Sequence, residues 1–127
     1  MTTTVTTGSA EPELKWFAFT LRIADPIVDA HPLKLYFPFD GRITKVVSQT
    51  RSSTGTDTVT FSIMVAGVDL TDYQDLVSTQ SLGIEYTDGT DSAINDIDQG
   101  EALEVDITAL GGTGHTYFDV EVQGYLR

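Results

Sequence analysis

Large apolar side chains recur at every second position in several stretches of the chain, which is the spacing of a half-buried β-strand. The clearest stretch is 15–23. Its inward side would carry Phe17, Phe19, Leu21 and Ile23, and its outward side Trp16, Ala18, Thr20 and Arg22. Alternation over 58–67, 101–110 and 116–126 predicts three further strands, and apolar runs predict shorter ones over 33–39 and 42–50.

The later strands also have defined inward sets. These are Val59, Phe61, Ile63 and Val65, then Leu103, Val105, Ile107 and Ala109, then Phe118, Val120 and Val122. On the first of these strands we expect Thr58, Thr60, Ser62 and Met64 to face outward. The segment 111–115, GGTGH, predicts a hairpin loop between the last two strands. The run 71–77 is the one segment with a helix-like pattern.

Seven or eight short strands, with little helix and turn residues throughout, indicate an all-β chain. We therefore expect an antiparallel β-sandwich, with a jelly-roll-like arrangement, over residues 14–127. A chain of 127 residues fits one domain with one hydrophobic core.

Residues 1–13 have a different composition, with Val5 as the one large apolar side chain among Thr, Gly, Ser, Pro and Glu. Such a segment cannot offset the entropy of folding alone. We expect an extended N-terminal arm that docks on another chain. The candidate contact residues are Thr3, Thr4, Val5, Thr6, Glu11, Pro12 and Trp16. Trp16 could instead seal the rim of the sandwich.

The charge balance narrows the range of partners. Nineteen Asp and Glu against seven Lys and Arg give a net charge of −12, which repels the phosphates of nucleic acids. The N-terminus has no signal-peptide pattern and no stretch is long enough to cross a bilayer, so we expect a soluble, non-secreted protein without a membrane partner. Cysteine is absent, which excludes disulfides and thiolate metal sites.

The residue types that carry chemistry do not form a known catalytic pattern. His31 and His115 are predicted in turns, without a nucleophile motif. The acids Asp88, Asp91, Asp96 and Asp98 favour a solvated loop, with an irregular Ca²⁺ site as the alternative, because their spacing does not fit an EF-hand. A second set, Glu104, Asp106, Asp119 and Glu121, would lie on the exposed face of two neighbouring strands. We expect no enzymatic activity, no cofactor and no bound metal.

The order of strands and turns over 37–127 resembles a layout found in small virion proteins of tailed phages. In that layout one strand follows a Gly with I-x-x-V, another ends in I-x-V-x-G, and a turn reads I-x-x-G-[DE]-x-[IL]-x-V. The matching positions are Ile43, Val46, Ile63, Gly67, Ile97, Gly100, Glu101, Leu103 and Val105.

The resemblance implies a β-sandwich that acts as a capsid cement (decoration) protein on the outer surface of the shell. Such a protein would bind the major capsid protein, clamp capsid subunits and form a homotrimer. The alternative is a receptor- or glycan-binding module of a head or tail fibre. A glycan binder would need a groove lined by two or three aromatic residues, and the candidates are Trp16, Tyr36, Tyr73, Tyr86, Tyr117 and Tyr125.

Overall fold

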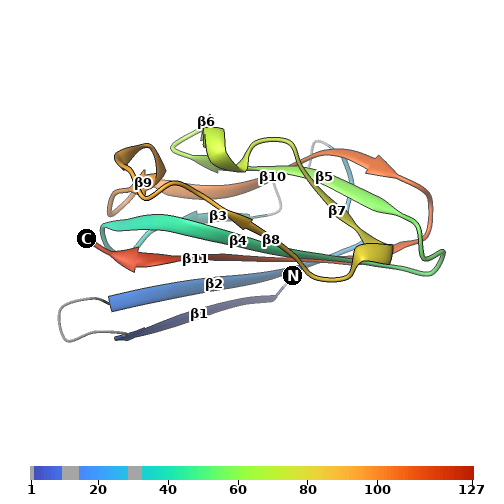
Figure 1. Ribbon diagram of the computed structural model, residues 1–127, viewed down its shortest axis with the longest axis horizontal. Coiled ribbons are helices and arrows are strands. Elements are labelled where there is room, and N and C mark those ends of the chain that lie inside the picture. Colours follow the sequence, from blue (N-terminus) through green and yellow to red (C-terminus); the bar gives the residue numbers. More distant parts are fainter. Residues whose placement is uncertain (1, 10–14, 29–32) are drawn as a thin grey trace.

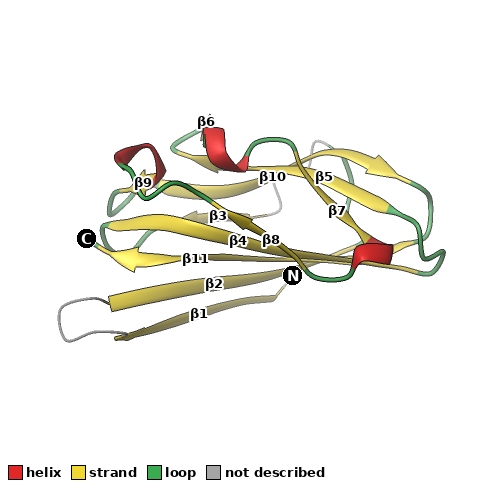
Figure 2. Ribbon diagram, viewed as in Figure 1, coloured by secondary structure: helices red, strands yellow, loops and turns green. Residues whose placement is uncertain are grey.

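The computed structural model describes residues 2–9, 15–28 and 33–127, and in these ranges the chain forms two packed antiparallel sheets (Figures 1 and 2). Sheet A has the order β1-β2-β11-β4-β8, with β9 also paired to β4. Its strands are β1 (Thr2–Ser9), β2 (Lys15–Ala24), β4 (Gly41–Ser52), β8 (Glu85–Asp88), β9 (Asp96–Ile97) and β11 (His115–Leu126). The all-β sandwich predicted from the sequence is confirmed.

Sheet B has the order β3-β10-β5-β6, with β7 also paired to β5. Its strands are β3 (Leu33–Tyr36), β5 (Thr58–Val65), β6 (Val68–Asp69), β7 (Leu76–Thr79) and β10 (Ala102–Gly111). Three short 3₁₀ helices lie in the connections, η1 (Thr71–Tyr73), η2 (Gln80–Leu82) and η3 (Ala93–Asn95).

The strand order is that of a jelly roll. Strands β2, β11, β4 and β8 face β3, β10, β5 and β7, and the chain passes from one sheet to the other at most connections. Each sheet therefore contains strands that are distant in sequence, and the core forms only when both sheets are complete.

Alternating apolar residues of both sheets fill the space between them. The predicted inward residues of β2 and β11 are all buried, as are those of β5. At one end of the core, four phenylalanines pack ring to ring, and they are Phe17, Phe19, Phe37 and Phe39. This cluster ties β2 of sheet A to the segment that follows β3 of sheet B.

The predicted hairpin at 111–115 is wrong. β10 lies in sheet B and β11 in sheet A, so this loop crosses between the sheets instead of joining paired neighbours. Glu104 and Asp106 consequently lie on a different sheet from Asp119 and Glu121, and the four acids do not share one face.

Three local predictions also differ from the structure. The register of β10 shifts between Ile107 and Ala109, so Ala109 is exposed instead of inward. Ser62 is buried instead of outward, because the backbone N–H of Asp75 donates to its hydroxyl and the chain covers that side. The run 71–77 forms a single 3₁₀ turn and then enters β7.

Residues 2–9 of the predicted arm are extended, but they pair within their own domain instead of leaving it. Thr2–Ser9 pairs with β2 along its whole length, with Thr4 opposite Thr20 and Gly8 opposite Trp16. Residues 2–9 therefore add an end strand to sheet A (Figure 1).

Candidate functional site

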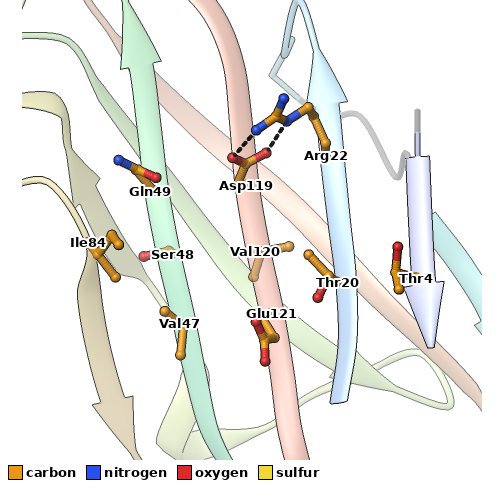
Figure 3. A pocket seen from close by; sticks show the side chains of 10 residues that line it. All are labelled: Thr4, Thr20, Arg22, Val47, Ser48, Gln49, Ile84, Asp119, Val120 and Glu121. Carbon is orange, nitrogen blue, oxygen red and sulfur yellow. Dashed lines mark hydrogen bonds and ion pairs between the residues drawn. The ribbon is translucent and has the colours of Figure 1, made fainter. Parts of the chain in front are cut away.

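The outward face of sheet A carries a shallow groove of about 390 Å³ (Figure 3). Its lining comes from β1, β2, β11, β4 and the residue just before β8. The lining residues are Thr4, Thr20, Arg22, Val47, Ser48, Gln49, Ile84, Asp119, Val120 and Glu121. The groove therefore crosses the full width of the sheet.

The strand register explains where the groove lies. Thr4, Thr20, Glu121, Val47 and Tyr86 stand opposite one another on five successive strands, so they form one row across the sheet. The first two side chains in the row are short. The surface is therefore low over β1 and β2 and rises toward β8.

A second hollow of about 310 Å³ continues the groove toward the start of β2. It shares Glu121 with the first hollow and reaches Trp16 past Ala18 and Gln123. Trp16 and Arg22 are six residues apart on one strand, which corresponds to about 20 Å. The two hollows meet at Glu121, and we call them together the channel: the first part crosses the sheet, and the second extends along β2, so that Trp16 and Arg22 lie at opposite ends of it.

The charged groups in the channel are paired. Arg22 Nε and Nη2 donate to the two carboxylate oxygens of Asp119 at 2.8 and 2.9 Å, and the guanidinium lies 4.1 Å from the centre of the Tyr117 ring (Figure 3). The hydrogen bond to Asp119 raises the pKa of Arg22. Gln123 Nε2 donates to Glu121 Oε1 at 2.9 Å. The channel therefore offers planar polar groups that are held in place.

On the β8 side, the channel is bordered by apolar and aromatic groups. Ile84 is exposed and faces the groove, and Tyr86 is 65% exposed. Lys45 Nζ lies 3.5 Å from Asp88 Oδ1 and 5.8 Å from the centre of the Tyr86 ring. These side chains are larger than those of Ala18 and Thr20 on β2.

The acidic loop after β8 is held by arginines. Arg42 donates to Asp96 at 2.6 Å and to Asp91 at 2.9 Å, and Tyr125 also donates to Asp91 at 2.6 Å. These bonds lower the pKa of Asp91 and raise that of Arg42. Arg127 binds Asp98.

Four acids were the candidates for an irregular Ca²⁺ site, but their carboxylates pair with Lys45, Arg42 and Arg127. In the described part of the chain, no group of three or more potential ligands could hold a metal ion.

His115 belongs to a structural network at the opposite end of the sandwich. Its Nε2 lies 3.0 Å from the Gly111 carbonyl oxygen and 3.8 Å from Asp57 Oδ2. Buried Asp57 accepts hydrogen bonds from Thr54, from Ser52 at 2.7 Å and from the Gly114 backbone at 2.7 Å, and these bonds lower its pKa. This network fastens the β4–β5 loop to the crossing loop 111–115. His31 lies outside the described residues.

The predicted contact residues fall into two groups. Thr3, Thr4, Val5 and Thr6 all lie in β1, and their partners on β2 are Leu21, Thr20, Phe19 and Ala18. Trp16 lies on the outer face of sheet A and is 37% exposed, so it borders the channel and does not seal the gap between the sheets. Glu11 and Pro12 lie outside the described residues.

The channel itself was not predicted from the sequence, although one sign was present. The outward side of 15–23 places two small residues between Trp16 and Arg22, which leaves space above the strand. Which strand lies beside it, and so brings Asp119 and Glu121 to the same surface, is decided by the jelly-roll pairing of β2 with β11.

Comparison with known proteins gives no assignment. No family model matches the chain, and no curated protein is significantly similar to it. None of the described residues belongs to a helix that is long and apolar enough to cross a membrane.

Proposed function

We propose that the chain is a structural protein of a tailed-phage virion, a capsid cement (decoration) protein that binds the outer surface of the shell and clamps capsid subunits. Two lines of argument support this. The layout of strands and turns over 37–127 resembles that of such proteins, and jelly rolls are common in viral capsid domains. The observation that carries the proposal is the free edge of β1.

β1 is an unusually open edge strand. It pairs with β2 on one side, and no other strand of the described residues pairs with it on the opposite side. Its eight residues, TTTVTTGS, contain no charge and no proline, which are the usual means of blocking an edge. A strand of this length offers a row of unpaired backbone groups about 25 Å long. Such an edge can accept a strand from another protein chain.

The other edges of the sandwich are less suited to this role. β3, β7 and β8 have four residues each, β6 and β9 have two each, and all of them except β7 include a charged residue. Short and charged edges resist strand addition. Attachment is therefore proposed through β1, with Trp16 at the end of the same surface as the exposed aromatic contact.

The partner proposed for this edge is the major capsid protein, with the decoration protein arranged as a homotrimer around threefold positions of the shell. The net charge of −12 opposes close approach of copies in free solution. Assembly on a shell supplies contacts that outweigh this repulsion. Trimers are therefore expected on the particle, and analytical ultracentrifugation of the free protein shows how much of the trimer forms without it.

The test uses particles that lack the protein, made by deleting its gene from the genome that encodes it. Recombinant protein is added back, the particles are washed, and the retained copies are counted by quantitative mass spectrometry. Thr6→Lys places a charge on β1 at an exposed position. Thr71→Lys places the same charge at an exposed position of η1, which follows β6 of sheet B. We expect Thr6→Lys to lose most attachment and Thr71→Lys to keep it. Equal retention of the two variants would contradict attachment through β1.

A further inference from the structure

We propose that the channel on the outer face of sheet A is a binding site for a neutral oligosaccharide. The channel borders the surface proposed for attachment and shares Thr4 and Trp16 with it, but it does not use the free backbone edge of β1, and its function goes beyond attachment to a shell. The argument rests on the shape of the channel, on the pairing of its charges and on the kind of hydrogen-bonding groups that it exposes.

The shape fits a short chain of sugar rings. The floor is low over Ala18 and Thr20, and the channel extends for about 20 Å between Trp16 and Arg22. The two hollows have volumes of about 390 and 310 Å³ and share Glu121, so one ligand can occupy both. Each volume alone falls within the range of small-molecule sites.

Aromatic rings are available at the borders. Trp16 lines one end of the channel, and exposed Tyr86 stands beside Val47 in the row that crosses the centre. Tyr117 lies at the other end, where the Arg22 guanidinium covers one face of its ring. A sugar ring has an apolar C–H face that packs against such a ring, while its hydroxyls remain free for hydrogen bonds. Trp16, Tyr86 and Tyr117 are thus brought to one face of the sandwich, whereas Tyr73 is buried and Tyr36 lies in β3 of sheet B.

The polar groups of the channel suit hydroxyls. Asp119, Glu121 and Gln49 present carboxylate and amide oxygens and an amide NH₂ group, which together accept and donate hydrogen bonds. A sugar hydroxyl also accepts and donates hydrogen bonds. The ion pair between Arg22 and Asp119 and the bond between Gln123 and Glu121 hold these groups in position before a ligand arrives.

Two features decide which class of ligand fits the channel: the charge of the protein, and the pairing of the backbone groups in sheet A. The single arginine of the channel is already paired with Asp119, and the chain carries a net charge of −12, so an acidic ligand is repelled. A peptide needs partners for its own N–H and C=O groups. At the centre of the sheet those backbone groups are used in pairing between β2 and β11. A neutral oligosaccharide needs side-chain partners only.

The experiment uses the fluorescence of Trp16, which is the one tryptophan of the chain and borders the channel. The probes are cellotetraose, maltotetraose and tetra-N-acetylchitotetraose at millimolar concentration, with heparin tetrasaccharide and a neutral tetrapeptide as comparisons. We expect at least one neutral oligosaccharide to change the fluorescence in a saturable way. No response to any of the three, or a saturable response to heparin or the peptide instead, would overturn the proposal.

Variants decide whether the response arises in the channel. Thr20→Phe fills the centre of the floor, and Thr71→Phe makes the same change outside the channel. We expect the first to abolish binding and the second to preserve it. Gln49→Ala, which removes an amide without filling space, should weaken binding several-fold. If Thr20→Phe and Gln49→Ala bind as tightly as the unchanged protein, the site is not in this channel. Both variants leave β1 unchanged, so their effect on attachment to particles is expected to be small.

Discussion

Phe37 is the residue whose removal should most directly weaken the contact between the two sheets. It is 1% exposed, and its ring centre lies 5.1 Å from that of Phe17, 4.9 Å from Phe19 and 5.0 Å from Phe39. Its backbone is also fixed, because its N–H donates to Glu101 and its carbonyl accepts from Gly100. Truncation therefore leaves a cavity that the surrounding chain cannot easily close.

The expected cost of Phe37→Ala is about 3–5 kcal/mol, which combines lost burial with the cavity left behind. A domain of this size typically has about 5–15 kcal/mol of stability in total, so the variant should fold with a much smaller margin. Phe37→Leu keeps most of the volume and loses the ring contacts, and should cost less than about 2 kcal/mol.

The assay is urea unfolding followed by circular dichroism, with Tyr36→Ala as the matched control. Tyr36 is the adjacent residue and is 63% exposed, so its truncation should change stability by less than about 0.5 kcal/mol. If Phe37→Ala and Tyr36→Ala cost the same, the aromatic cluster does not close the core at this end, and the packing argument is refuted.

Two further predictions concern the loops and the strand pairing. The lowered pKa of Asp57, caused first by its hydrogen bonds from Thr54 and Ser52, means that Asp57 stabilises the fold above its unfolded pKa. This contribution is lost as the pH falls below about 4. Asp57→Asn should therefore lower the melting temperature at neutral pH and flatten its fall in acid, and an unchanged acid profile would contradict this. Gly124→Ala would place a methyl group against the Arg42 carbonyl oxygen, where the register of β11 and β4 shifts. It should cost about 1–3 kcal/mol in urea unfolding, and a neutral effect would show that the two strands can separate there.

Much of the fold could be predicted from the sequence because alternation of apolar residues depends on local geometry alone. The strands around Phe17, Phe61 and Phe118 were identified with their correct inward faces. Ala109 was assigned to the wrong face because one extra residue in β10 reverses the alternation, and a bulge of this kind leaves little trace in composition.

Strand pairing could not be predicted in the same way. A glycine-rich loop between two strands usually indicates a hairpin, but here it crosses between the sheets because β10 pairs with β3 and β5. The channel depends on this pairing, since Thr20 and Glu121 are about a hundred residues apart in the chain and meet only when β11 lies beside β2. The N-terminal segment was expected to leave the domain because of its composition, yet backbone pairing with β2 over residues 2–9 needs no apolar side chains.

The central claim is that the chain is a component of a phage shell, and the most direct measurement is its abundance in purified particles. Particles produced from the genome that encodes the chain are banded on a density gradient, and the protein is quantified by mass spectrometry relative to the major capsid protein. The account predicts a copy number in fixed proportion to the capsid lattice, in multiples of three. Absence from the particles, or only the few copies expected of a fibre, would contradict it.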